Sequence, residues 1–155
     1  MSPRGRKSTE VNVTNMRNKR PGWRVRDKFA FLLAVMGKLA GGAHISFEGD
    51  LDPFPLAEIR GASSRETEVL KRNTLWPKQD FVVLPLEETT VQQITKTMGG
   101  SWSRRIYHIQ IEKNGVLEFG TYDSFDPACF NFGAAFDHEF MAFLTGEKLL
   151  EEDWD

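Results

Sequence analysis

Residues 104–122, RRIYHIQIEKNGVLEFGTY, show the clearest structural pattern in the chain. Apolar and polar residues alternate on both sides of Asn114-Gly115, and this pattern predicts two antiparallel strands joined by a tight turn. A two-residue turn would set polar side chains opposite apolar ones on one face of the hairpin. A three-residue turn with a left-handed Gly115 in a bulge avoids that conflict, so we predict the longer turn. Its pairs are Ile111 with Leu117, Ile109 with Phe119 and Tyr107 with Thr121.

One face of this hairpin is apolar and the reverse face is polar. The polar side chains alternate with the apolar ones along both strands, so they point to the opposite side of the sheet. We expect this reverse face to meet solvent or a partner. Its members are His108, Gln110, Glu112 and Glu118.

The segments outside the hairpin show either helical or strand periodicity. Gly-Gly pairs follow two of the helical segments and mark where these end. The predicted helices are 28–40, 91–98 and 136–145, and the predicted strands are 43–50 and 81–84. Residues 67–74 fit a short helix or a strand. We favour a strand, because residues 76–80 read as a turn that leads into a β run.

The order of these elements sets the expected architecture. Helix, strands, helix, hairpin and helix follow one another without the βαβ alternation that builds parallel sheets. We therefore predict a single α+β domain with a mainly antiparallel sheet of about five strands and with helices packed on one face. The length of 155 residues suits one domain, because natural domains commonly contain about 100 to 150 residues.

Charge is sorted along the chain, although the formal net charge is only −2. Residues 1–28 carry nine Lys and Arg against two acidic residues, and residues 121–155 carry nine Asp and Glu against one Lys. The first 22 residues also lack the apolar periodicity that orders a segment. We expect a flexible basic arm at 1–22, a globular domain at 23–147 and an acidic tail at 148–155.

Cysteine content and hydropathy indicate a cytoplasmic protein. Cys129 is the only cysteine, so no intramolecular disulfide can form. The first residues contain no apolar stretch of the kind found in a secretory signal, so we expect none. The most apolar segment, 29–40, is much shorter than the ~20 residues of a membrane span. We expect no membrane partner and no cofactor. Cys129 itself is expected to be a small buried side chain rather than a nucleophile.

The basic arm indicates contact with nucleic acid. Residues 3–7, Pro-Arg-Gly-Arg-Lys, resemble the core of an AT-hook, the short peptide that binds the minor groove of A·T-rich DNA. The resemblance covers these five residues, and Lys7 stands where a usual AT-hook has proline. Nonspecific contact with phosphates is the broader expectation. The arm residues assigned to nucleic acid are Arg4, Gly5, Arg6, Lys7, Arg17, Lys19 and Arg20.

Other residue patterns are better explained by structure than by chemistry. His138-Glu139 lacks the second histidine of a zinc-binding helix, because residue 142 is alanine, so we expect both side chains on a helix surface. The phenylalanines between residues 125 and 143 are partly at helical spacing. We expect them to pack in the core rather than form a recognition surface.

These observations favour binding over chemistry. We expect a non-enzymatic binding or regulatory module that recognises a macromolecular partner, an unidentified protein. Two alternatives remain open: a nucleic-acid-associated protein that uses the basic arm, and a small hydrolase-like enzyme with a carboxylate site at Glu48, Asp50 and Asp52. For these carboxylates we favour a solvated strand end. A pocket in which carboxylates converge with His44 or His108 would favour the enzyme.

Overall fold

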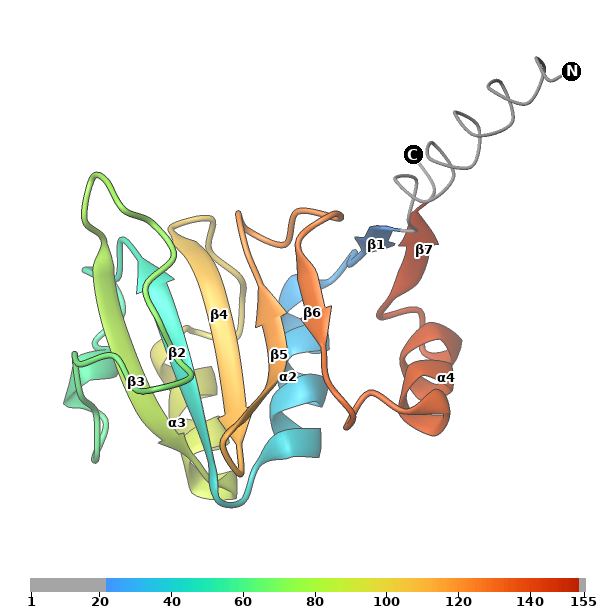
Figure 1. The fold of residues 1–155 in the computed structure, drawn as a ribbon, viewed down its shortest axis with the longest axis horizontal. Helices are drawn as coiled ribbons and strands as arrows, with labels where there is room; N and C mark the ends of the chain where they lie inside the picture. Colours follow the sequence, from blue (N-terminus) through green and yellow to red (C-terminus); the bar gives the residue numbers. More distant parts are fainter. Residues whose placement is uncertain (1–21, 154–155) are drawn as a thin grey trace, which may run out of the picture.

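Five antiparallel strands form the central sheet, in the order β3-β2-β4-β5-β6 (Figure 1). The structure is a computed structural model, and it describes residues 22–153. The strands are β2 (Ala43–Gly49), β3 (Asp80–Leu86), β4 (Ile106–Lys113), β5 (Val116–Thr121) and β6 (Phe130–Phe132). Each neighbouring pair is antiparallel. The predicted α+β fold with a mainly antiparallel sheet is therefore confirmed.

Two helices cover one face of this sheet (Figure 1). They are α2 (Lys28–Leu39) and α3 (Glu88–Thr97). The side chain of Asp27 accepts a hydrogen bond from the backbone N–H of Ala30, so α2 begins where the sequence predicts. In contrast, α3 begins three residues earlier than predicted. The hydroxyl of Thr90 accepts the backbone N–H of Glu87 and stabilises this earlier first turn.

The third helix, α4 (His138–Gly146), lies beyond the β6 side of the sheet, next to a small second sheet (Figure 1). The second sheet pairs β1 (Gly22–Arg24) with β7 (Glu151–Asp153). Ion pairs join Arg24 to Asp153 and Arg26 to Glu151 across it. Part of the segment 148–155 thus pairs with the domain, while the three-part division of the chain stays a prediction. No helix within residues 22–153 has the length and apolar character to cross a membrane.

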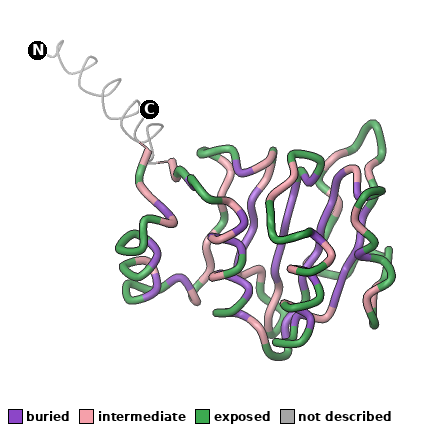
Figure 2. Tube along the Cα trace, turned by 180° about the vertical axis from the view of Figure 1, so that it is seen from behind, coloured by how far each residue is buried: buried purple, intermediate pink, exposed green. Residues whose placement is uncertain are grey.

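The hydrophobic core lies between the sheet and the two covering helices, and buried residues run along the central strands (Figure 2). Ile45 and Phe47 of β2 and Ile109 of β4 are fully buried in it. The phenylalanines between residues 125 and 143 pack in or against this core as predicted, except Phe143, which is 50% exposed.

The hairpin of β4 and β5 corrects the predicted register. Asn114 and Gly115 have φ of 56° and 78° and form a two-residue turn. A bulge then shifts the register, so that Ile111 faces Phe119 rather than Leu117. The predicted three-residue turn is therefore wrong, although the left-handed conformation of Gly115 is confirmed. The bulge sets apolar side chains opposite each other without a longer turn.

The segment before β3 corrects a second prediction, because residues 67–74 form neither a strand nor a helix. Several of their backbone N–H groups bind side chains instead of a neighbouring strand. The periodicity of the sequence does not predict hydrogen bonds between backbone N–H groups and distant side chains. At the outer edge of β3, an isolated antiparallel β-bridge between Ser63 and Val83 takes the place of the predicted strand.

Candidate functional site

A loop covers the face of the sheet that lies opposite α2 and α3 (Figure 1). We name it the 64–79 loop; it precedes β3 in the chain. The polar side chains beneath it are buried, so the expectation that His108 and Gln110 meet solvent or a partner is wrong. Strand alternation fixes which way a side chain points but not what lies above it. The buried polar residues of this face include Ser46, Glu48, His108 and Gln110.

Glu48 fastens the loop to the sheet. Its side chain is 1% exposed, and Oε1 accepts the backbone N–H of Asn73 at 2.7 Å while Oε2 accepts that of Thr74 at 3.1 Å. A buried carboxyl group is costly unless hydrogen bonds replace its lost water, and both oxygens have such a bond here. Glu48 is therefore engaged in holding Asn73 and Thr74 in place.

His108 is a second anchor, on the neighbouring strand and directly opposite Glu48. Its Nδ1 lies 3.2 Å from the backbone nitrogen of Asp123, and its Nε2 lies 2.8 Å from the Thr74 hydroxyl. A backbone N–H can only donate, so Nδ1 accepts and carries no proton. The ring is then the neutral tautomer with its proton on Nε2, which donates to Thr74. His108 thus links the loop to the turn that contains Asp123.

Gln110 is a third anchor further along β4. Its Oε1 accepts the backbone N–H of Lys71 at 3.1 Å, and its Nε2 donates to the hydroxyl of Tyr122 at 3.0 Å. The hydroxyl of Ser46 is 3.5 Å from the same Oε1. Buried polar groups of a sheet are stable only when they are paired in this way. The polar face therefore specifies one position for the loop.

Apolar and cationic contacts complete the attachment. Leu70 is fully buried and packs with Phe81 and Val83 in a small second core. The guanidinium of Arg72 lies 5.0 Å from the ring centre of Phe81 and donates to the backbone oxygen of Gln79 at 2.6 Å. These contacts hold the loop on both sides of residues 73–77.

The tip of the loop presents two large apolar side chains to solvent. Leu75 is 95% exposed and Trp76 is 85% exposed, directly after the anchored Thr74. Tryptophan is usually well buried in folded proteins, so this exposure is unusual. Lys71 and Lys78 flank the tip, and neither forms an ion pair within residues 22–153. We name Leu75 and Trp76 the apolar tip.

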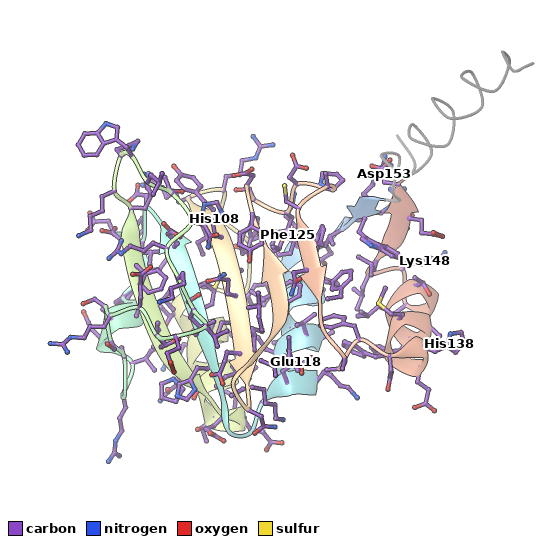
Figure 3. The ribbon with its side chains drawn as sticks, in the orientation of Figure 1. His108, Glu118, Phe125, His138, Lys148 and Asp153 are labelled. Carbon is purple, nitrogen blue, oxygen red and sulfur yellow. The ribbon has the colours of Figure 1, made fainter. Side chains whose placement is uncertain are left out.

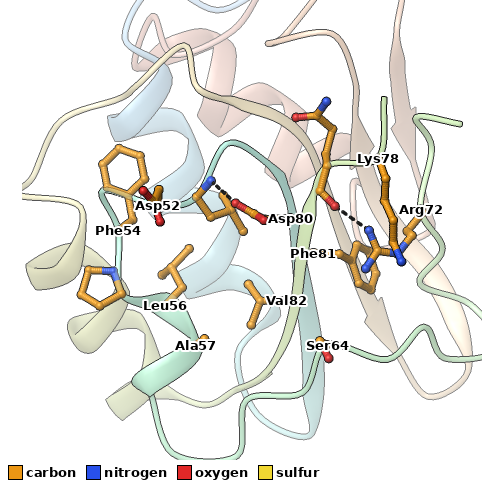
Figure 4. A pocket seen from close by; sticks show the side chains of 13 residues that line it. Asp52, Phe54, Leu56, Ala57, Ser64, Arg72, Lys78, Asp80, Phe81 and Val82 are labelled. Atoms are coloured by element: carbon orange, nitrogen blue, oxygen red, sulfur yellow. Dashed lines mark hydrogen bonds between the residues drawn. The ribbon is translucent and has the colours of Figure 1, made fainter. Parts of the chain in front are cut away.

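A groove of about 540 Å³ lies at the β3 edge of the sheet (Figure 4). We name it the β3 groove. Its apolar lining includes Leu51, Leu56 and Val82, which are buried, and polar side chains stand around them. Asp80 accepts the backbone N–H of Leu51 at 3.1 Å. The polar side chains of the groove are Asp52, Ser64, Arg72, Lys78, Gln79 and Asp80.

The structure does not bring together the three carboxylates of the predicted enzyme site. Glu48 lies under the 64–79 loop, Asp50 forms an ion pair with Arg105, and Asp52 lines the β3 groove. The groove contains the carboxylates of Asp52 and Asp80, but no histidine lines it. The convergence of carboxylates with a histidine that would favour a hydrolase is therefore not found at this groove.

The other predicted site residues lie apart from these features. His138 is on α4, at the far end of the molecule from His108 (Figure 3). Both His138 and Glu139 are exposed, as predicted for a helix surface. Within residues 22–153, no group of three or more His, Cys, Asp or Glu side chains is arranged to hold a metal ion. All seven arm residues assigned to nucleic acid lie outside the described residues.

Cys129 is only partly buried, whereas the sequence predicts a buried side chain. Burial nevertheless raises the pKa of its thiol, and the neighbouring carboxylates of Asp126 and Asp123 raise it further. A raised pKa favours the neutral thiol over the nucleophilic thiolate. Cys129 therefore lacks the electrostatic surroundings of a catalytic cysteine.

The apolar tip is not among the features predicted from the sequence. A signal for it is present, because Leu75-Trp76-Pro77 combines two large apolar residues with proline between the basic residues at 71–72 and 78. The spacing of these residues matches neither a strand nor a helix, so their exposure follows only from the three-dimensional fold.

Comparison with known proteins identifies no relative: no family model, no curated protein and no solved structure matches this chain.

Proposed function

We propose that the protein is a non-enzymatic binding module that recognises a macromolecular partner through the apolar tip. The exposure of Leu75 and Trp76 is the observation that carries this proposal. Tryptophan is enriched among the residues that contribute most to protein interfaces, because it brings a large contact area with few rotatable bonds. Two such side chains at one loop tip form a natural anchor for a partner.

The anchoring of the loop supports the same proposal. Binding is weakened by the entropy lost when a loop becomes ordered on contact. Here Glu48 and Gln110 already fix the backbone on the N-terminal side of the tip, and His108 holds the side chain of Thr74. On the other side of the tip, the side chain of Arg72 bonds to the backbone oxygen of Gln79. A loop held in this way needs less ordering when a partner binds.

The chemistry of the anchors also favours binding. Glu48 and His108 are the buried titratable groups of the polar face, and both are engaged in hydrogen bonds that position the loop. A general base needs a lone pair that can reach a substrate proton. Both Glu48 oxygens and Nδ1 of His108 already accept backbone N–H groups.

The test compares the full-length protein with a Leu75→Ala, Trp76→Ala double variant. The tagged proteins are cross-linked in extracts, and proteins that attach to the wild type are identified, purified and titrated by calorimetry. Hot-spot residues contribute about 2 kcal/mol or more, so the tip variant is expected to bind at least roughly 30-fold more weakly.

Val116→Ala is the matched control, because Val116 is a half-exposed apolar residue at the hairpin turn, outside the 64–79 loop. This control is expected to retain the wild-type affinity. Equal affinity of the tip variant and the wild type for every purified partner would refute the proposal.

A further inference from the structure

We infer that the β3 groove binds a short extended peptide, which pairs with the outer edge of β3 at Phe81. This inference goes beyond the proposed function, because the apolar tip has no part in it. The observation behind it is an unpaired stretch of strand edge inside the groove. Backbone hydrogen bonds to such an edge give affinity for an extended peptide, and the side chains around the edge select its sequence.

Strand geometry shows which backbone groups of β3 point outward. In an antiparallel pair, successive residues direct their N–H and C=O groups alternately towards the neighbouring strand and away from it. Both backbone groups of Val83 bond to Ser63, on the side away from β2. The pairing of β2 with β3 contains no register shift, so Phe81, two residues earlier, also directs its N–H and C=O away from β2.

These two groups of Phe81 have no partner. Within residues 22–153, no hydrogen bond reaches its N–H or its C=O from the outer side of the strand. Phe81 is nevertheless only 5% exposed, and it lines the β3 groove. Buried backbone groups without a partner are rare in folded proteins. A donor and an acceptor left free inside a groove therefore mark a position for another backbone.

The chain itself covers the edge on both sides of this gap. Ser63 pairs with Val83 on one side, and Arg72 donates to the carbonyl of Gln79 on the other. Four residue steps separate positions 79 and 83, which is about 13 Å of strand, and three extended residues span about 10 Å. The gap therefore fits three residues, with the middle one opposite Phe81. The bridge at Ser63 is antiparallel, and we assign the peptide the same direction.

The groove suits backbone pairing better than the docking of a large apolar side chain. Its volume of about 540 Å³ lies within the range of roughly 300–1,000 Å³ that is typical of sites for small ligands. Its apolar residues Leu51, Leu56 and Val82 are at most 8% exposed, so they offer little contact area. Affinity then comes from hydrogen bonds and charges alone, and we expect a Kd on the order of 1 mM.

Charges of opposite sign lie on the two sides of this gap. The guanidinium of Arg72 lies over the ring of Phe81, and Lys78 lies beside it (Figure 4). Asp80 directs its side chain to the opposite face of β3, because side chains alternate along a strand, and Asp52 lies on that side of the groove (Figure 4). None of these four charged side chains forms an ion pair within the described part of the chain.

This arrangement selects the sequence of the peptide. The side chains of an added strand alternate between the same two faces as those of β3. The residue opposite Phe81 therefore directs its side chain towards Arg72 and Lys78, and its two neighbours direct theirs towards Asp52 and Asp80. An acidic residue between two basic residues matches these charges. The ligand class is an extended segment with the pattern basic, acidic, basic.

The test titrates the ¹⁵N-labelled full-length protein with the capped peptide acetyl-Lys-Glu-Lys-amide and follows the backbone amides by NMR. The amide proton of Phe81 is expected to move downfield and to saturate at millimolar peptide, because its N–H gains an acceptor. A peptide with N-methylated glutamate lacks the N–H that bonds to the Phe81 carbonyl, and we expect it to bind at least tenfold more weakly. Acetyl-Lys-Lys-Glu-amide keeps the composition but loses the alternation, and we expect at least fivefold weaker binding.

A pair of protein variants tests the role of the groove. Asp52→Asn removes one carboxylate from the groove lining at an exposed position, and it is expected to weaken binding of the first peptide about threefold. Glu58→Gln is the matched control, because it removes an exposed carboxylate from the neighbouring turn, outside the groove lining. This control is expected to keep the wild-type affinity.

Several results would overturn the inference. One is an unmoved Phe81 amide at about 10 mM peptide, and another is equal affinity for the N-methylated peptide. A Phe81 amide that shifts with protein concentration in the absence of peptide would show that a second copy pairs with the edge instead. Equal affinity for the two peptide sequences, or for Asp52→Asn and the wild type, would refute the assigned charge pattern. The proposed role of the apolar tip stands or falls separately, because none of these measurements involves it.

Discussion

The attachment of the 64–79 loop to the sheet is tested most directly by Glu48→Gln. Glutamine keeps the shape of the side chain but replaces one accepting oxygen with a donating NH₂ group. One of the two backbone N–H groups, that of Asn73 or that of Thr74, then loses its acceptor. A hydrogen bond to a charged group contributes about 1.5–3 kcal/mol, so we expect opening of the loop to become about 2 kcal/mol easier.

This free energy corresponds to an approximately 30-fold increase in the equilibrium population of the open loop. Trypsin provides the assay, because the loop contains Lys71, Arg72 and Lys78. When opening and closing are fast, the rate of cleavage follows the population of the open form. Cleavage within the loop is therefore expected to be about 30-fold faster in Glu48→Gln than in the wild type.

Glu68→Gln is the matched control, because it makes the same chemical change at an exposed position of the same loop. Urea unfolding, followed in parallel, separates local opening from loss of the whole fold. Removal of a buried charge also relieves a desolvation cost, which opposes the effect of the lost bond. If Glu48→Gln is cleaved at the rate of the control, the Glu48 carboxylate makes no net contribution to the closure of the loop, and its anchoring role is refuted.

Three further predictions concern the hairpin, the thiol and the arm. Gly115→Ala should lower the free energy of unfolding by about 1 kcal/mol in urea, because φ is +78° and the strain is conformational; an unchanged midpoint would contradict this. Cys129 should react with a disulfide reagent only at higher pH than free cysteine does, because its pKa is raised, and Asp126→Asn should shift the reaction to lower pH. Deletion of residues 1–21 should leave the unfolding transition unchanged and abolish salt-sensitive binding to DNA or RNA, as filter binding at several salt concentrations can measure.

The elements of the fold follow largely from the sequence, because their signals are local. The helix at 28–39 is recognised by apolar spacing and by Asp27, which caps its own first turn. The hairpin is recognised by alternation around Asn114-Gly115, and Gly115 adopts the expected positive φ. Each of these features depends on residues within one or two turns of chain. The antiparallel sheet with helices on one face then follows from the order of the elements.

The hairpin register and the site required the tertiary structure. The bulge between Ile111 and Glu112 depends on how the two strands meet the core, which alternation alone does not specify. Glu48 and Thr74 are 26 residues apart, and Thr74 and His108 are 34 apart. No local sequence pattern predicts hydrogen bonds between residues so far apart in the chain.

The class of fold, the main helices and the polar face of the sheet can be predicted from the sequence, because side-chain periodicity and capping act over a few residues. The coverage of this face by the 64–79 loop instead of solvent is visible only in the folded structure, because it depends on contacts between distant segments. The same packing leaves Leu75 and Trp76 on the surface of the protein, where they are 95% and 85% exposed. Burial depends on contacts between distant segments, so two apolar residues that composition alone would assign to the core became the apolar tip.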